Sequence, residues 1–153
     1  MRCVVQRVAR ASVRVDGGIS GEIGRGLLVL AAFAPGDGEA EMAWMVRKLL
    51  GLRIFPDDDD RMNLSLRDVD GGLLLVSQFT LYGDCRKGNR PGFTASAPPA
   101  AAEAMYDRFA ALLHEAWPRV AEGRFGAMMD VELLNAGPVT LIIDRDNPGE
   151  TSA

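Results

Sequence analysis

Short apolar runs separated by glycine-containing turns fill the first part of the chain, and this pattern is typical of β-strands. Mixed period-two segments at residues 1–8 and 11–15 lead into Asp16-Gly17-Gly18, which suits the positive-φ positions of a tight hairpin turn. The pattern returns at Ile19–Ile23. The run Leu27–Phe33 is apolar at every position, so we predict a strand covered on both faces. The chain up to residue 33 is therefore predicted to be all β.

Helical spacing follows, and it predicts one helix in the middle of the chain and another in its second half. The first is expected from Glu39 to about Leu50 and the second from Ala100 to about Trp117. The apolar positions at this spacing are Met42, Met45, Val46 and Leu49 in the first, and Met105, Phe109, Leu112, Leu113 and Ala116 in the second. Such faces pack helices against a sheet. We therefore interpret these residues, with Trp44 beside them, as core rather than as a ligand-binding stripe.

The stretch Leu73–Leu81, with the sequence LLLVSQFTL, lies between the predicted helices and is framed by glycine-containing turns. Its continuous apolar start predicts a central strand covered on both faces. Ser77, Gln78 and Thr80 then interrupt the apolar run. A buried polar group without a partner costs roughly 1 to 3 kcal/mol, so these side chains must be satisfied internally or face a cleft. We expect function at this end of the strand.

The remaining segments are predicted to be short strands. Leu52–Phe55 and Leu64–Leu66 lie on either side of an aspartate-rich loop. The last third of the chain returns to β structure, with strands at Met128–Leu134 and Val139–Asp144. Asn135-Ala136-Gly137-Pro138 separates these strands, and the residues alone indicate a hairpin turn, because glycine followed by proline is ordinary turn chemistry.

The order of these elements predicts a single mixed α/β domain over residues 1–145, with curved β-layers and both helices packed outside. Residues 146–153 are predicted to be a polar tail. A chain of 153 residues, of which 48% are hydrophobic and 25% charged, is long enough to bury a full core. We expect no second domain.

The sequence also predicts a compartment, the reducing cytosol. The amino terminus has arginine within its first apolar patch and lacks the apolar core of a signal peptide, and no stretch is long enough to span a membrane. Cys3 and Cys85 are far apart in the sequence and do not make a disulfide framework. We therefore predict a cytoplasmic protein.

The net charge of −4 argues against a protein that binds nucleic acid along an extended backbone track. Local contact stays open, because Arg86, Lys87 and Arg90 cluster within an aperiodic segment at residues 82–99. Loops of this length in a compact domain are usually functional or disordered. We interpret this segment as an ordered loop that contacts an anion or a nucleotide, and a solvated connection is the alternative.

Side chains for the common hydrolytic mechanisms are scarce. The single histidine, His114, lies on the second predicted helix, and no spacing pairs it with Ser77 or Cys85 as a catalytic couple. No zinc-ligand spacing is present, and Asp57–Asp60 lacks the alternation and the distant glutamate of a calcium loop. We expect no metal and no cofactor. An enzyme with this sequence would work with backbone groups, hydroxyls and its own substrate.

Two polar segments interrupt the predicted β structure, SQFT at residues 77–80 and NAGPVT at residues 135–140. Each alone is weak evidence of function, but together they are specific evidence. In this order and at this separation they resemble the motifs of bacterial D-aminoacyl-tRNA deacylases. The resemblance is collinear from Met1 to about Asp144. The segments that carry it are QRV and ARASV within 6–13, GEIG and GLLVL within 21–30, LRIFPD at 52–57, MNLS at 62–65, VSQFTLYGD at 76–84, KGNRPGF at 87–93, GRFGAMM at 123–129 and NAGPVT at 135–140.

The resemblance implies a homodimer that hydrolyses the ester between a D-amino acid and the terminal adenosine of tRNA, and that also removes glycine from tRNA for alanine. The implied fold has two β-layers and a layer of helices. The implied active site combines Ser77, Gln78, Phe79 and Thr80 of one subunit with Gly137 and Pro138 of the other. The Gly-Pro bond of the family is cis, at a cost of about 0.5 to 1 kcal/mol. Its carbonyl oxygens hold the substrate ammonium and leave no room for an L side chain, so selection is by rejection.

The same resemblance implies the supporting residues of the site. They are Arg7, which steadies the partner's Gly-Pro carbonyls, Asn135 and Thr140 within the motif, Phe125 and Met129 as walls for the terminal adenine, and Arg86, Lys87 and Arg90 as contacts to tRNA.

For the chemical step, backbone N–H groups near Phe79 and Thr80 are expected to form an oxyanion site, at about 3 kcal/mol per donor. Thr80 is either a nucleophile or a residue that positions substrate and water. A nucleophile needs an activating base, which the sequence does not supply. We favour positioning, assisted by the vicinal ribose hydroxyl of the tRNA.

Ala136 departs from the family pattern, which commonly has aspartate at this place in the motif. We expect alanine at this position to change the local hydrogen bonding of the turn. It also favours an alternative function, that of a catalytically inactive dimeric protein that binds the tRNA end. An esterase of small D-amino acid esters is a third hypothesis.

Overall fold

Strand β1 (Arg2–Val15) organises the fold, because it pairs with strands on both of its edges. In the computed structural model, which describes residues 1–146, β1 pairs antiparallel with β3 (Gly26–Ala32) through its first half and with β2 (Gly18–Ile23) through its second half. Strand β8 (Asp130–Asp144) runs antiparallel along the other edge of β1. The predicted tail at 146–153 lies, from residue 147 on, outside the described residues.

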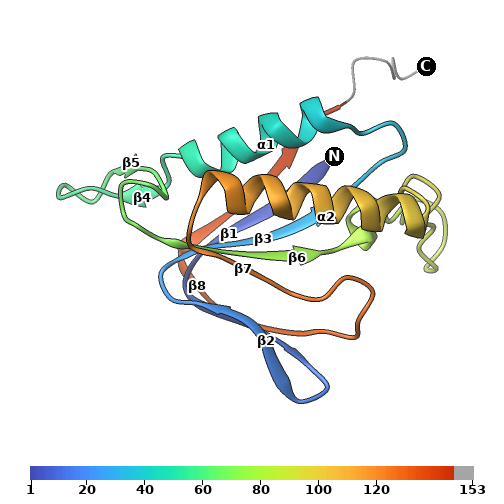
Figure 1. Cartoon of the computed structure of the whole chain (residues 1–153), viewed down its shortest axis with the longest axis horizontal. Helices are drawn as coiled ribbons and strands as arrows, with labels where there is room; N and C mark the ends of the chain where they lie inside the picture. The colour runs from blue at the N-terminus through green and yellow to red at the C-terminus, as the bar shows by residue number, and fades with distance from the viewer. Residues whose placement is uncertain (147–153) are drawn as a thin grey trace.

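Parallel strands extend the sheet beyond β3, and helices make the crossovers. β6 (Gly72–Ser77) pairs parallel with β3, and β7 (Val120–Glu122) pairs parallel with β6. The crossovers carry α1 (Glu39–Gly51) and α2 (Pro99–Ala116), which lie side by side on one face of the sheet (Figure 1). No helix among the described residues combines the length and apolar character that crossing a membrane requires.

Two buried clusters form the core, one on each face of the sheet. The larger cluster lies between the sheet and the helices and contains Leu73, Leu75 and Phe109. The smaller cluster lies on the opposite face and contains Leu74 and Val76. Alternate residues of β6 therefore enter different clusters, and this confirms the prediction that the strand is covered on both faces.

The sheet curls until β2 approaches β7, where the Ser20 hydroxyl lies 3.2 Å from the Glu122 carbonyl oxygen. Glycines permit this curvature, because backbone segments approach more closely than a Cβ atom would allow. A Cβ on Gly26 would lie 1.9 Å from the carbonyl oxygen of Gly72, and one on Gly21 would lie 2.5 Å from that of Glu122. The predicted architecture, curved β-layers with outer helices, is confirmed.

The central strand is shorter than predicted, and this corrects one expectation. β6 ends at Ser77, and Phe79–Tyr82 forms a 3₁₀ helix, η1, rather than the last part of a strand over Leu73–Leu81. The Gln78 N–H still donates to the Ala31 carbonyl oxygen (2.8 Å). Beyond this point η1 makes its own i→i+3 hydrogen bonds, for which an apolar run in the sequence gives no signal.

The hairpin predicted at Asn135–Pro138 is wrong. β8 is one continuous strand that pairs with β1 on both sides of this segment, from Arg2↔Asp144 to Arg14↔Asp130. The register shifts between Gln6 and Val8 and between Val8 and Arg10, so the extra residues of β8 form a bulge. A glycine-proline step suits a bulge as well as a turn, and long-range pairing with β1 decides between them.

Smaller differences concern the short strands. The structure has β4 at Phe55–Pro56 and β5 at Met62–Leu64, which pair as a separate hairpin beside the main sheet. These strands are shifted from the predicted Leu52–Phe55 and Leu64–Leu66. Strand β7 was not predicted, because its burial comes from parallel pairing with β6 rather than from an apolar run of its own.

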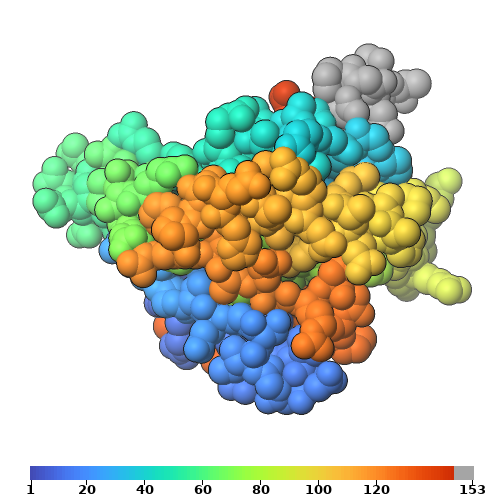
Figure 2. Space-filling view, viewed as in Figure 1, coloured from blue at the N-terminus to red at the C-terminus, as the bar shows by residue number. Residues whose placement is uncertain are grey.

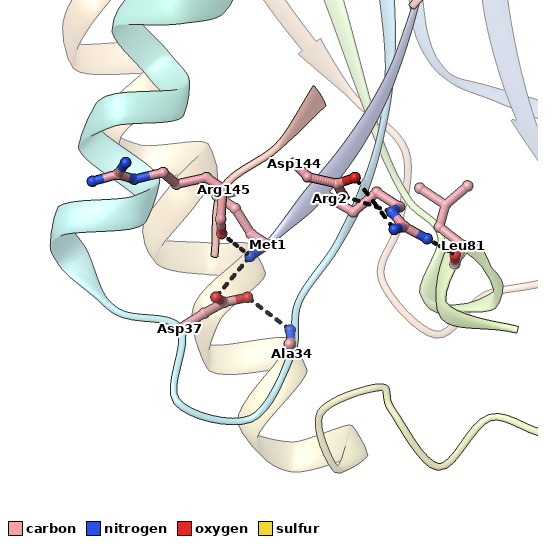
Figure 3. Close-up of polar contacts among 7 residues, drawn as sticks. All are labelled: Met1, Arg2, Ala34, Asp37, Leu81, Asp144 and Arg145. Carbon is pink, nitrogen blue, oxygen red and sulfur yellow. Dashed lines mark hydrogen bonds and ion pairs between the residues drawn. The ribbon is translucent and has the colours of Figure 1, made fainter. Parts of the chain in front are cut away.

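The amino terminus is anchored inside the fold (Figure 3). The Met1 ammonium donates to Asp37 Oδ1 (2.7 Å) and to the Arg145 carbonyl oxygen (2.7 Å). Asp37 Oδ2 accepts the Ala34 N–H (2.7 Å), and the Arg145 N–H returns to the Met1 carbonyl oxygen (2.9 Å). This ion pair joins the start of β1, the end of β8 and the loop before α1.

The cysteines differ in environment, and this predicts unequal reactivity. Both are free, with Cys3 buried in β1 and Cys85 exposed. Burial raises the pKa of the Cys3 thiol to about 12, so its thiolate is scarce at neutral pH. In a titration with an aromatic disulfide reagent, we expect Cys85 to react in the native protein and Cys3 only after unfolding. Rapid modification of the Cys85→Ser variant under native conditions would contradict this prediction.

Candidate active site

The predicted catalytic residues lie where β6 leaves the sheet. Ser77 pairs with Ala31 as the last residue of the strand. Gln78 then adopts φ −148° and ψ 73°, which ends the extended backbone before η1 begins. The Leu81 N–H donates to the Gln78 carbonyl oxygen (3.1 Å), and the Gly83 N–H donates to that of Thr80 (2.9 Å). The sheet thus holds the start of this segment, and local hydrogen bonds hold the rest.

The N–H groups of Phe79 and Thr80 have no hydrogen-bond acceptor among residues 1–146, because they open the 3₁₀ helix. The Thr80 hydroxyl accepts a hydrogen bond from the Gln78 side-chain amide. Adjacent free N–H groups are donors of the type that stabilises an oxyanion. Within the described residues, no histidine or carboxylate side chain is hydrogen-bonded to Thr80, and a nucleophilic role would require one.

A predominantly apolar cavity of about 440 Å³ adjoins this segment. Its walls are Ser77, Phe79, residues 93–94 and 96–99, the first turn of α2 and the loop after β7. Phe79 is 54% exposed, and its ring meets Phe93 edge to face with the ring centroids 5.4 Å apart. Phe125 forms another wall and packs its ring against Tyr106. A cavity of this size and character suits a small ligand with a flat apolar part.

The resemblance implies that Phe125 and Met129 both contact the adenine. In the structure, Phe125 lines this cavity and Met129 does not. Phe125 packs against the helix-side cluster and lines the cavity. Met129 packs against the cluster on the other face of the sheet, and a Cβ on Gly123 would lie 2.7 Å from its sulfur. The structure therefore brings Phe125, but not Met129, to Ser77 and Phe79.

The NAGPVT motif forms the bulge of β8, with Gly137 at φ +124°. Arg7 Nε donates to the Ala136 carbonyl oxygen of the same chain (2.8 Å), and Arg7 Nη1 donates to that of Ile54. Asn135 Nδ2 donates to the Val139 carbonyl oxygen (3.1 Å). Arg7 thus steadies the motif of its own chain, and its contact with the partner's Gly-Pro carbonyls stays a prediction. Arg7 reaches its own motif because β1 and β8 are neighbours in one chain.

The Gly137–Pro138 peptide bond is trans, as are the other peptide bonds between described residues. This differs from the cis bond that the resemblance implies.

In one chain, the NAGPVT motif and the catalytic segment lie apart. β3 and β1 separate β6 from β8, which amounts to three strand spacings or roughly 14 Å along the sheet. Ser77 also lies in the row of Ala31, Cys3 and Ile143, whereas Gly137 lies between residues that pair with Gln6 and Val8. The motif lines a different cavity, of about 280 Å³, with Arg7 and Phe55.

The predicted tRNA contacts lie on the segment that projects beside the amino-terminal end of α2 (Figure 2). Arg86, Lys87 and Arg90 are exposed there. Arg86 donates to both carboxylate oxygens of Asp84 (2.9 and 2.7 Å), and these hydrogen bonds lower the pKa of Asp84 to about 2. The pair keeps its opposite charges above that pH, so Lys87 and Arg90 carry the uncompensated positive charge.

Other candidate groups are engaged elsewhere. His114 Nε2 lies 2.7 Å from Glu122 Oε1 near the carboxyl end of α2, about 18 Å along the helix from Ala102 at the cavity. This excludes a couple of His114 with Ser77. No group of His, Cys, Asp and Glu side chains in the described part of the chain could hold a metal. Asp57 accepts backbone N–H groups of its own loop.

Sequence reasoning missed two contributions to the site. Residues 93–94 and 96–99 line the cavity, and only the aromatic character of Phe93 within a long loop pointed there. Arg2 donates to the Leu81 carbonyl oxygen in η1 (3.0 Å). Nothing in the sequence indicates that contact, because it joins residues 79 positions apart.

Known proteins resemble this chain over almost its whole length. The family model described as D-Tyr-tRNA(Tyr) deacylase matches residues 4–144. A D-aminoacyl-tRNA deacylase of Prosthecochloris aestuarii is 57% identical over 94% of this chain and 99% of its own length, and one of Acaryochloris marina is 50% identical over 98% and 99%.

Solved structures match the fold over nearly the whole chain. One described as "c-Myc DNA Unwinding Element Binding Protein" has a TM-score of 0.90 and 40% identity, and covers 96% of this chain and 100% of its own. Another, described as a probable eukaryotic D-amino acid tRNA deacylase, has a TM-score of 0.81 at 22% identity and shows the fold alone. The family match, the near full-length identity and the shared fold together show that the chain belongs to the D-aminoacyl-tRNA deacylases, a family of hydrolases.

Proposed function

We propose that this protein hydrolyses the ester between a D-amino acid and the 3′-terminal adenosine of tRNA, and that it does so as a homodimer in the cytoplasm. One observation carries the proposal. Ser77, Phe79 and Phe125 line a single apolar cavity, and the N–H groups of Phe79 and of the adjoining Thr80 have no acceptor among the described residues. Such a cavity accommodates a flat base beside a reacting carbonyl. The family to which the chain belongs supports the reaction type.

The chemical step follows from the groups at the cavity. Water attacks the ester carbonyl carbon, and the N–H groups of Phe79 and Thr80 stabilise the oxyanion that forms. The tetrahedral intermediate collapses with cleavage of the bond to the ribose oxygen, which takes up the proton that water loses. The vicinal ribose hydroxyl relays this proton. Thr80 positions substrate and water, since no described side chain is placed to activate it as a nucleophile.

Chiral selection belongs to the Gly137–Pro138 carbonyls of a second copy of the chain. The separation of this motif from Ser77 within one chain supports a site completed by dimerisation. Exposed apolar residues near the motif support the same assembly, with Leu134 47% and Ile142 69% exposed on β8. Glycine has no side chain to reject, so glycine on tRNA for alanine is also cleaved.

The inactive tRNA-end binder is less well supported. Its only basis is the alanine at position 136 in place of the usual aspartate. Residue 136 contributes its backbone carbonyl oxygen to Arg7, and alanine supplies that acceptor as well as aspartate does. Substitution at this position therefore leaves the contact with Arg7 in place.

Hydrolysis time courses with D-Tyr-tRNA, L-Tyr-tRNA and glycine on tRNA for alanine test the proposal. We expect release of D-tyrosine and glycine but not of L-tyrosine. Pro138→Ala should weaken the preference for the D substrate, because it alters the carbonyls that reject an L side chain. Equal release of both tyrosine enantiomers by the unaltered protein would contradict the selection mechanism. Binding of the tRNA without turnover would instead favour the inactive binder.

A further inference from the structure

The turn that carries Phe79 and Thr80 lies at the surface, where the Phe79 ring packs against Phe93. None of the residues of η1 is buried. Besides the hydrogen bonding within η1 itself, local hydrogen bonds hold its two ends, from the Leu81 N–H to Gln78 and from the Gly83 N–H to Thr80. An exposed turn held by local hydrogen bonds opens easily unless another element restrains it. The position of the oxyanion donors therefore depends on what holds this turn from outside.

Arg2 supplies that restraint from the first residue of β1 (Figure 3). Arg2 Nη1 donates to the Leu81 carbonyl oxygen (3.0 Å), and the guanidinium lies 5.3 Å from the centroid of the Tyr82 ring. Across residues 1–146, no other side chain outside the segment 78–83 donates to a backbone carbonyl of η1. A charged donor to a backbone carbonyl is stronger than a neutral one.

Asp144 aims the guanidinium at the turn. Arg2 Nε donates to Asp144 Oδ1 (2.7 Å) and Nη2 donates to Oδ2 (3.3 Å), which leaves Nη1 directed at Leu81. The residues face each other directly across the β1–β8 pair. These hydrogen bonds also raise the pKa of Arg2, so it stays protonated. Asp144 ends the strand that carries Gly137 and Pro138.

We infer that Arg2 and Asp144, together with the Leu81 carbonyl, form a clasp that positions the Phe79 and Thr80 N–H groups for the reaction proposed above. Arg2 and Asp144 are positioning residues, because neither lines the cavity. The clasp also ties η1 to the strand pair that holds the selection motif, since Arg7 of β1 binds Ala136 of β8. The same pair of strands therefore holds both this chain's η1 and the selection motif that this chain would contribute to the site of its partner.

The kinetic test compares Arg2→Met with a matched control on the same strands. We expect Arg2→Met to lower kcat for D-Tyr-tRNA by roughly 10- to 100-fold, with KM within about twofold, because misplaced donors act on the reacting atoms rather than on tRNA binding. Arg2→Lys should recover part of the loss. Arg10→Met breaks the exposed Arg10–Glu132 contact (3.8 Å) across the same strands and should leave both constants unchanged.

Hydrogen exchange measures the clasp without any substrate. In Arg2→Met, the Leu81 and Gly83 amides should exchange roughly tenfold faster while amides in the middle of β6 keep their protection. Asp144→Asn should give a smaller change, because Arg2 keeps its own donor to Leu81. Unchanged exchange in both variants would overturn the clasp, as would an equal loss of kcat in Arg10→Met. An unaltered protein without turnover would overturn the proposed function alone, because exchange still decides the clasp.

Discussion

Gly137→Ala is expected to lower kcat/KM for D-aminoacyl-tRNA on the order of 100-fold, the effect of moving a positioning group by about 1 Å. Gly137 has φ +124°, a conformation that costs an L residue roughly 1 to 3 kcal/mol. A Cβ at this position would lie 1.9 Å from Arg7 Nη2 and 2.9 Å from Cζ. The guanidinium would have to leave the Ala136 and Ile54 carbonyl oxygens that it holds. The bulge that carries the Gly137–Pro138 carbonyls would then lose its contact with Arg7 through Ala136.

The effect of Gly137→Ala should be local. The displaced group is the flexible end of Arg7 rather than backbone, so we expect the loss of stability to be limited to the backbone strain of roughly 1 to 3 kcal/mol. Gly24→Ala is the matched control, because no atom lies within 4 Å of its added Cβ and the position does not have a positive φ. Hydrolysis time courses with D-Tyr-tRNA measure kcat/KM for both variants. Full activity in Gly137→Ala would show that the bulge geometry is not needed.

Asp37→Asn is expected to reduce the free energy of unfolding by about 3 to 5 kcal/mol, the cost of removing one partner of a buried ion pair. The side chains of Met1 and Asp37 are 0% and 2% exposed, so solvent cannot replace the lost charge. Asparagine also places an N–H₂ group near the Met1 ammonium or the Ala34 N–H, where Asp37 has an acceptor for each. The loss is large against total stabilities of about 5 to 15 kcal/mol.

Urea unfolding at a fixed protein concentration measures this loss, since the stability of the proposed dimer depends on concentration. The control is Glu132→Gln, which breaks a contact whose side chains are 64% and 67% exposed and should cost less than about 1 kcal/mol. A loss in Asp37→Asn no larger than in this control would mean that the Met1–Asp37 pair adds nothing to stability.

Sequence patterns predicted most of the fold because burial periodicity is a local property. The run Leu73–Val76 indicated a strand covered on both faces, and its residues do alternate between two clusters. The helical spacing of Met42, Met45 and Leu49 likewise gave α1 within a residue of its ends. Boundaries failed where an apolar run continued through a change of backbone, as at Phe79–Tyr82.

The site was predicted less completely, because it depends on pairings between distant residues. Ser77, Phe79 and Phe125 meet at one cavity, but Met129 lies on the other face of the sheet, and the motif holding both residues gives no sign of this. A bulge and a hairpin turn have the same glycine-proline signal, and only pairing with β1 distinguishes them. The contact of Arg7 with its own chain depends on that same pairing.

By itself, the sequence determined the order of strands and helices, the doubly covered central strand, the absence of a histidine-based couple and the motifs of a D-aminoacyl-tRNA deacylase. The tertiary structure decided that β8 is one strand, that η1 opens with free N–H groups, and that Arg2 and Asp144 hold that turn. The reason is physical. Periodicity and motif chemistry are written in neighbouring residues, whereas strand register and the direction of a charged side chain are set by partners far away in the sequence.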